Sequence, residues 1–253
     1  MRAALLCFVC AIALPAADLA PTGTLRAAFL GANPVQARPG SKPGEYTGVV
    51  PDLVAELARK LGVPYKLIPA PNARGVMDAV KSHEADIGFL AFDESRAREV
   101  DFSKPYALMY NAYLVRADSP LMKSADVDRA GIKVGAVKGQ SQEIYLSETI
   151  RNAKMIALPK EPSDPELEAM MLKGDFDAFG ENRERAEGTA SHTPKLRALG
   201  DNFSFVGQAF VVDKGGQAKI ADLNAFVDET LASGLVKNSL DRAKLAGVGV
   251  AGR

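Results

Sequence analysis

The sequence predicts an α/β protein built from two lobes. Three observations lead to this prediction: the composition is that of an ordinary globular chain, the first half alternates strand and helix patterns, and a similar alternation restarts in the second half. The chain has 253 residues, 47% of them hydrophobic, and its 31 basic side chains balance 31 acidic ones. Because a balanced charge gives no general attraction to nucleic acid or anionic lipid, neither is expected as a partner.

Residues 1–17 are predicted to be a secretory signal peptide. Arg2 precedes an apolar run that ends at Leu14, and small alanines follow it. The run is shorter than the roughly 20 residues that a membrane-spanning helix needs. Both cysteines of the chain, Cys7 and Cys10, lie inside it. We therefore expect the exported protein to contain no disulfide, thiolate nucleophile or cysteine-ligated metal.

The first half of the chain is expected to form a parallel sheet covered by helices. In 50–61 the apolar residues recur at the 3.6-residue spacing of a helix, and Gly62 just past them is a typical helix end. The continuous apolar run 87–92 is typical of a strand buried on both faces. In chain order we expect a strand at 25–30, a helix at 50–61, a strand at 65–68, a helix around 76–80 and a strand at 87–92. This alternation predicts parallel pairing.

A second α/β unit follows and restarts the same alternation. We expect a strand at 132–137, helices at 141–149 and 166–172, a strand at 176–179, and closing helices at 220–231 and 235–245. The β-rich segments 110–116 and 203–212 flank this unit, and we expect both to cross between the lobes. The predicted first lobe is therefore 18–110 plus 208–253, and the predicted second lobe is 111–207.

Five motifs along the chain resemble the extracellular solute-binding proteins of polar amino-acid ABC transporters. They are GVVPDLVAELARKLG at 48–62, ADIG at 85–88, RAREVDFSKPY at 96–106, VGAVKGQS at 134–141 and KGDFDA at 173–178. The resemblance implies a two-lobed fold of the type II periplasmic binding protein, in which two crossing strands form a hinge and the lobes close on a small solute. It also implies a monomeric periplasmic protein whose partners are the solute and an ABC permease, without a cofactor or a metal.

The resemblance implies that Arg96 binds the solute carboxylate, because a guanidinium group matches that planar anion with two parallel hydrogen bonds. The alternative is a solvated surface arginine, which we expect instead for Arg98. Phe89 and Ala91 precede Arg96 at a strand end, where they would line the binding cleft with backbone carbonyls or pack in the core. Asp93 is a candidate acceptor for a solute ammonium group.

In the second lobe, Gln140, Ser141 and Gln142 lie between a predicted strand and a predicted helix. Free N–H groups at a helix N-terminus, together with the Ser141 hydroxyl, form an anion site that would complete the binding of the carboxylate. The alternative for Ser141 is an ordinary helix cap. The alternative for the two glutamines is a solvated turn, since polar side chains are usually exposed.

Several positions depart from the pattern of the amino-acid-binding members of this family. Ala73 and its neighbours stand where an aromatic platform is usual, and Asn33 stands where an aromatic or acidic side chain often meets the solute. Asn182 replaces the usual aspartate that pairs with the ammonium group, although the adjacent Glu181 could take this role if the strand end shifted by one residue. Arg74 would favour an acidic solute at the cleft rim, and is otherwise a solvated residue at a helix start.

An enzyme is the main alternative to a binding protein. Some secreted dehydratases share this fold, and Asp93, Glu181, Lys138 and Glu143 are acid–base candidates. A free-standing sensor module is a third alternative. The sequence shows no phosphate-binding loop, nucleophile elbow or histidine pair for a metal. We therefore predict a periplasmic protein that captures a carboxylate-bearing solute, such as an amino acid, for an ABC importer and catalyses no reaction.

Overall fold

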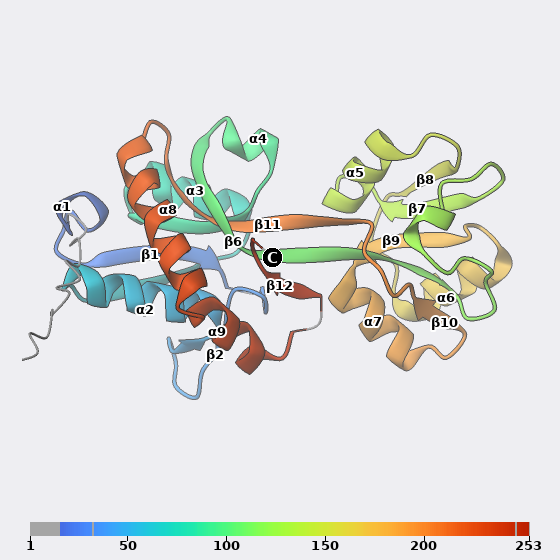
Figure 1. Ribbon diagram of the computed structural model, residues 1–253, viewed down its shortest axis with the longest axis horizontal. Coiled ribbons are helices and arrows are strands. Elements are labelled where there is room, and N and C mark those ends of the chain that lie inside the picture. Colours follow the sequence, from blue (N-terminus) through green and yellow to red (C-terminus); the bar gives the residue numbers. More distant parts are fainter. Residues whose placement is uncertain (1–15, 32, 246, 253) are drawn as a thin grey trace, which may run out of the picture. The chain divides into compact units, whose positions relative to one another are not determined.

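A computed structural model describes residues 16–31, 33–245 and 247–252 (Figure 1). The predicted signal peptide lies outside these residues except for its last two positions, and Cys7 and Cys10 lie outside them too. The first described element is the short helix α1 (Ala16–Leu19).

The chain divides into two compact units. Unit 1 contains the residues up to Leu90 with Ser95–Ser103 and Phe210–Asp228, and unit 2 contains Ala91–Glu94, Lys104–Ala209 and the residues from Glu229 onward. Strands β6 (Val100–Arg116) and β11 (Ser204–Asp213) have residues in both units. The predicted segment 203–212 includes the passage from Ala209 to Phe210, whereas β6 passes between the units at Ser103 and Lys104, before the predicted segment 110–116. The lobe boundaries 18–110 plus 208–253 and 111–207 stay a prediction, and the structure groups the residues from Glu229 with unit 2.

Unit 1 is built on three parallel strands. β1 (Leu25–Leu30) pairs with β4 (Tyr65–Ala70) on one side and with β5 (Ile87–Ala91) on the other. Helix α2 (Val49–Leu61) lies between β1 and β4 in the chain, and α3 (Ala73–Lys81) lies between β4 and β5. These are the five elements that the sequence predicted, in the predicted order.

The two helices cover opposite faces of β1. Ala28 belongs to a buried cluster that includes four residues of α3, namely Val76, Met77, Ala79 and Val80. Side chains alternate along a strand, so the fully buried Ala27 and Phe29 face the other way, toward the side of β1 on which Figure 1 shows α2. Helix α2 ends at Gly62, whose φ of 70° is a left-handed conformation that glycine adopts without strain.

Unit 2 repeats this arrangement with a second set of parallel strands. β7 (Lys133–Val137) pairs with β8 (Lys154–Leu158) and with β9 (Ala178–Asn182), and β9 pairs with β6 in antiparallel fashion. Helix α5 (Ser141–Thr149) follows β7, and α6 (Asp164–Lys173) follows β8. The sequence predicted β7, α5 and α6 but missed β8.

Two buried clusters lie on the two faces of the unit 2 sheet. Ala112 and Leu114 of β6 pack against α6 and against α7 (Arg183–His192), the helix that follows β9. The intervening Tyr113 and Val115 pack against α5 instead. Because successive side chains of β6 enter different clusters, this strand is buried on both faces.

An aspartate fastens the start of a neighbouring strand in each unit. Asp86, just before β5, accepts a hydrogen bond of 2.8 Å from the backbone N–H of Arg26 in β1, and its own N–H donates to the Arg26 carbonyl at 2.8 Å. Asp177, just before β9, makes the same two bonds with Lys133 of β7, at 2.9 and 2.8 Å. The observed strand β9 therefore begins two residues later than the predicted strand 176–179, because Asp177 serves this connection.

The remaining elements are shorter or lie near the C-terminus. They are the hairpin strands β2 (Arg38–Pro39) and β3 (Tyr46–Thr47), α4 (Glu94–Ala97), the 3-10 helix η1 (Ser124–Asp126), β10 (Leu196–Ala198), α8 (Gln217–Ala232), α9 (Leu235–Ala243) and β12 (Val248–Val250). The two predicted closing helices correspond to α8 and α9.

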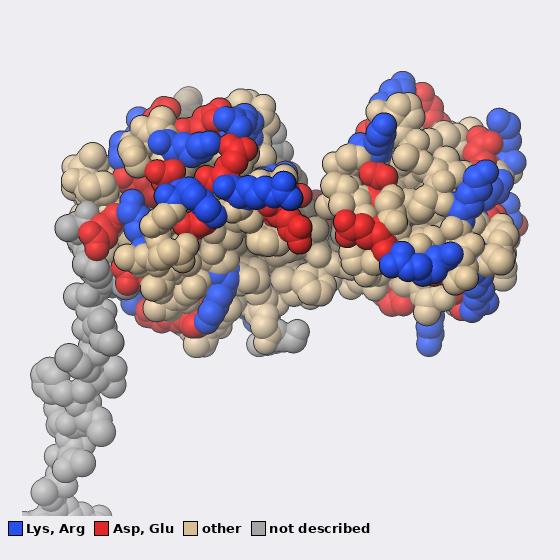
Figure 2. Space-filling view, turned by 90° about the horizontal axis from the view of Figure 1, so that it is seen from above, with Lys and Arg blue, Asp and Glu red and all other residues tan. Residues whose placement is uncertain are grey.

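No helix among the described residues is long and apolar enough to cross a membrane. On the face that Figure 2 shows, basic and acidic side chains are interspersed over both units.

Candidate functional site

The carboxyl ends of β1, β4 and β5 share one edge of the unit 1 sheet, because the three strands are parallel. Open α/β sheets bind ligands at this edge. Three of the predicted site residues follow it in the chain: Asn33 comes after β1, Ala73 after β4 and Arg96 after β5.

A residue that the sequence analysis did not single out organises this edge. Gln36 is fully buried; its Oε1 accepts from the N–H of Leu30 at 2.8 Å, and its Nε2 donates to the carbonyl of Phe89 at 3.2 Å. The Phe89 ring packs against Phe210 with 4.5 Å between ring centroids. Phe89 is therefore a core residue, which agrees with the alternative that it packs in the core. Its carbonyl accepts a hydrogen bond from Gln36.

Asn33 and Arg74 already use their polar groups within unit 1. The Oδ1 of Asn33 accepts from the Val35 N–H at 3.0 Å in a tight turn. Arg74 forms ion pairs with Asp78 at 2.9 Å and with Glu99 at 3.2 Å, which makes it a surface residue held by carboxylates. Ala73 is the first residue of α3, so no aromatic platform stands at this helix start.

Arg96 lies in α4, the short helix that follows β5. Arg96 is half-buried, whereas Arg98 is exposed. Ala91 is the last residue of β5, and Asp93 directly precedes α4; both are half-buried. Residues 91–94 belong to unit 2, whereas Arg96 belongs to unit 1.

In unit 2 the first turn of α5 follows the carboxyl end of β7. Gln140, not Ser141, is the N-cap residue, and Ser141 is the first helical residue, with its hydroxyl 3.3 Å from Oε1 of Gln142. Within the described chain, the N–H groups of Ser141, Gln142 and Glu143 have no hydrogen-bond acceptor. Three open N–H groups at the positive end of a helix dipole form a site that suits an anion.

Gln142 is a buried residue, so the solvated-turn alternative is wrong for it, whereas its contact with a solute stays a prediction. Only 6% of it is exposed, and its Nε2 donates to Oδ1 of Asn111 at 3.0 Å. Asn111 in turn donates to the Ser204 hydroxyl at 2.8 Å. The amide of Gln142 thus fixes the first turn of α5 to both crossing strands, because an unpaired buried amide would be costly.

A cluster of three carboxylates surrounds one arginine beside this helix turn. The Nε of Arg185 lies 3.0 Å from Oε1 of Glu161 and 3.4 Å from Oε2 of Glu181, and its Nη2 lies 3.6 Å from Oδ1 of Asp164. The side chain of Gln140 donates to Oε2 of Glu161 at 2.8 Å. The cluster therefore connects the ends of β8 and β9 to the N-terminus of α5.

Glu181 is the least exposed member of the cluster, at 3%. Burial, together with the neighbouring Glu161 carboxylate, raises the pKa of Glu181 to about 8. Its Oε1 accepts from the backbone N–H and the side-chain amide of Asn182, at 2.7 and 3.0 Å. The Oδ1 of Asn182 caps α7 by accepting from the Arg185 N–H at 2.9 Å. Asn182 thus holds Glu181 and α7 in place.

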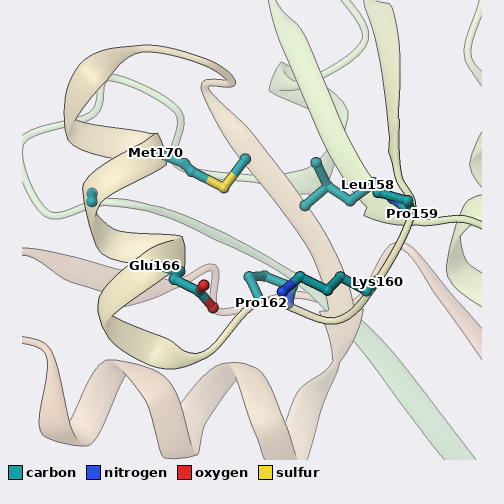
Figure 3. A pocket seen from close by; sticks show the side chains of 7 residues that line it. Leu158, Pro159, Lys160, Pro162, Glu166 and Met170 are labelled. Atoms are coloured by element: carbon teal, nitrogen blue, oxygen red, sulfur yellow. The ribbon is translucent and has the colours of Figure 1, made fainter.

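Two hollows lie in unit 2 near these residues. One, of about 330 Å³, is mainly apolar; in Figure 3 Leu158 and Met170 point toward each other across it, and Lys160 lies on the loop at its rim. The other, of about 370 Å³, is lined by Tyr110, Tyr145, Asn202, Phe203, Ser204 and Phe205. Among the described residues no group of three or more His, Cys, Asp and Glu is arranged to hold a metal ion.

A family model for bacterial extracellular solute-binding proteins, family 3, matches residues 26–242. The chain belongs to this family. Among the proteins similar to it, a probable histidine-binding protein of Campylobacter jejuni is 28% identical over 209 residues, which are 79% of this chain and 77% of that protein. The L-cystine-binding protein TcyJ of Escherichia coli is 25% identical over 219 residues, which are 85% of this chain and 80% of that protein.

Solved structures show the same two-lobed fold of type II. The amino-acid ABC transporter substrate-binding protein AbpA of Streptococcus pneumoniae, bound to L-arginine, matches with a TM-score of 0.60 and 23% identity over 89% of this family 3 chain and 96% of that chain. An ancestral cyclohexadienyl dehydratase matches with a TM-score of 0.58 and 22% identity over 91% of this chain and 96% of that one.

Proposed function

We propose that this family 3 protein is the periplasmic binding component of an ABC importer and that its solute is an amino acid or a related small carboxylate. The observation that carries the proposal is the family match over residues 26–242. The names of two relatives, a probable histidine-binding and an L-cystine-binding protein, support an amino acid as the solute. The proposed partner is a membrane permease, and the proposed state in solution is a monomer.

Arg96 is the proposed partner of the solute carboxylate in unit 1. Its support is the motif RAREVDFSKPY, the position of Arg96 just past the carboxyl end of β5, and its partial burial, which sets it apart from Arg98. A charge-assisted hydrogen bond contributes about 1.5–3 kcal/mol, a large part of the roughly 8 kcal/mol that a micromolar affinity represents. In unit 2 the open N–H groups of Ser141, Gln142 and Glu143 are the proposed second anion site.

The carboxylate cluster is the proposed site for the solute ammonium group. Glu161, Asp164 and Glu181 surround a single cation, Arg185. With the pKa of Glu181 at about 8, its carboxyl group is mostly neutral at pH 7, which leaves two carboxylates against one guanidinium. Glu161 is the more exposed of the two glutamates, with 35% of its side chain accessible, so it is the proposed direct acceptor in place of Asn182 or Asp93.

We also propose that the protein leaves its solute unchanged. The family and the relatives are binding proteins, and the likeness to an ancestral dehydratase is a likeness of fold. Calorimetric titration of the purified protein with individual amino acids, followed by analysis of the recovered solute, tests both parts. Saturable heat with intact solute supports binding, whereas consumption of the solute at catalytic amounts of protein would establish an enzyme.

A further inference from the structure

Helix α4, which carries Arg96, is a single short turn. It spans Glu94–Ala97, and none of its residues is fully buried. Two hydrogen bonds engage its last carbonyl groups. The Arg96 carbonyl accepts from the N–H of Glu99 at 2.9 Å, and the Ala97 carbonyl accepts from Nζ of Lys214 at 2.7 Å. A lysine at this place also suits the negative end of the helix.

Lys214 is itself fixed by a buried carboxylate. Its Nζ lies 2.8 Å from Oδ1 of Asp101, of whose side chain 7% is exposed. The other oxygen, Oδ2, accepts from the N–H of Gly215 at 2.8 Å and from Nε2 of Gln217 at 3.0 Å. Asp101 therefore orients both the ammonium group of Lys214 and the backbone of the turn between β11 and α8. Asp101 belongs to the same motif as Arg96. Lys214 comes from a distant part of the chain, 117 positions after Ala97.

The turn after α4 has a second attachment, in which every partner is exposed. Glu99 accepts from Nζ of Lys81 at 2.7 Å and pairs with Arg74 at 3.2 Å, and all three side chains are more than a third exposed. Exposed ion pairs of this kind contribute little, because water and salt screen them. The side chain of Lys214 is also 52% exposed, but its ammonium group reaches a backbone carbonyl of α4 and a carboxylate of which only 7% is exposed.

We propose that Lys214 is a positioning residue for Arg96: it holds α4 so that the guanidinium group meets the solute carboxylate. This inference rests on the proposed role of Arg96. The motif then has a physical explanation, because Asp101 fixes Lys214, and Lys214 fixes the helix that carries the proposed ligand residue.

The test has two arms. In the first, L-histidine, L-arginine and L-lysine are titrated calorimetrically into the parent and the Lys214→Ala, Lys214→Arg and Lys219→Ala variants. Lys214→Ala should weaken binding at least tenfold, Lys214→Arg should restore most of it, and the control Lys219→Ala on α8 should stay within twofold. In the second arm, hydrogen exchange without solute should become faster across 94–101 in Lys214→Ala alone.

A double-mutant cycle separates positioning from general stability. In the Arg96→Lys background, Lys214→Ala should weaken binding by much less than in the parent, because the group that it positions has already been replaced. Equal losses in both backgrounds would overturn the proposal, and so would unchanged exchange across 94–101 or affinity retained by Lys214→Ala. If Arg96→Lys itself binds as the parent does, the proposed role of Arg96 fails. If none of the three amino acids binds, the solute is a different one, and the exchange arm decides whether Lys214 holds α4: unchanged exchange across 94–101 overturns the proposal.

Discussion

Glu181 places its Oε2 3.4 Å from Nε of Arg185 without forming a hydrogen bond, and that oxygen has no other hydrogen-bond partner among the described residues. The same Nε lies 3.0 Å from a Glu161 oxygen. The Nε itself has no hydrogen-bond partner among the described residues, so both carboxyl groups meet it as ion-pair neighbours. Since only one of them is substantially solvated, the buried Glu181 keeps its proton at neutral pH.

The stability of the protein should therefore depend on the charge of Glu181. Its pKa in the folded state is about 8, above the ordinary value of 4.5, so the folded state binds the proton more tightly than the unfolded state does. The protonated Glu181 contributes fully to the free energy of unfolding below pH 4.5, and this contribution is lost as pH rises through 8. The free energy of unfolding then falls by at most about 1.4 kcal/mol per pH unit. The Glu181→Gln side chain cannot ionise, so the melting temperature of this variant should rise relative to that of the parent as pH increases from 6 to 9.

Glu187→Gln, on the surface of α7, serves as the control. A difference in melting temperature between Glu181→Gln and the parent that stays constant from pH 6 to 9 would contradict the prediction.

Arg96→Ala should weaken solute binding roughly 10- to 150-fold, the equivalent of one charge-assisted contact of about 1.5–3 kcal/mol. Arg96→Lys should recover only part of the loss, because an ammonium group keeps the charge without the planar fork. Calorimetry measures both. Arg98 is exposed, so Arg98→Ala should change the binding free energy by less than about 0.5 kcal/mol. If Arg98→Ala weakened binding and Arg96→Ala did not, the assignment of Arg96 as the arginine that binds the solute carboxylate would be wrong.

The carboxylate cluster predicts that the α-amino group of the solute contributes strongly to binding. An amino acid should bind at least a hundredfold more tightly than its deaminated analogue, which corresponds to about 2.7 kcal/mol. Glu161→Gln should remove most of this preference, whereas Glu166→Gln, on the first turn of α6, should preserve it. Matched titrations of the two solutes decide the matter; equal affinities in the parent protein would exclude an ammonium site.

Asp86 should be a major contributor to the stability of unit 1. It is 5% exposed and binds both the backbone N–H and the guanidinium group of Arg26, at 2.8 and 3.0 Å. Asp86→Ala leaves these donors unpaired and should cost about 3 kcal/mol of unfolding free energy, which chemical denaturation measures. Asp241→Ala, which breaks the exposed pair with Lys237, should cost less than about 1 kcal/mol. Similar losses in the two variants would refute this role for Asp86.

The sequence predicted those elements whose burial follows a regular period. Helix α2 has one continuous buried face, and β5 is buried along nearly its whole length, so both patterns were unambiguous. By contrast, β8 has no fully buried residue, and α7 buries only Ala186 and Thr189 within a polar segment. The α7 segment shows no apolar period, and the apolar run of β8, residues 155–158, is only four residues long.

The same physical difference explains which site residues could be predicted. Arg96 belongs to a motif, and the helix turn at Ser141 follows a clear strand, so the sequence alone was enough to propose both. Glu161 follows the unpredicted β8 and Arg185 lies on the unpredicted α7, so their meeting with Glu181 could not be foreseen. Gln142 looked like a surface residue because a buried amide cannot be told from an exposed one until its partner, here Asn111, is known.

The central claim, capture of an intact amino acid, has one direct measurement. The protein is purified from its native export compartment without added solutes, denatured, and the released small molecules are quantified by mass spectrometry, with the Arg96→Ala variant prepared in parallel. We expect one amino acid or related carboxylate in an amount approaching that of the parent protein, and far less from the variant. Release of a solute without a carboxylate, or of equal amounts from parent and variant, would contradict the account.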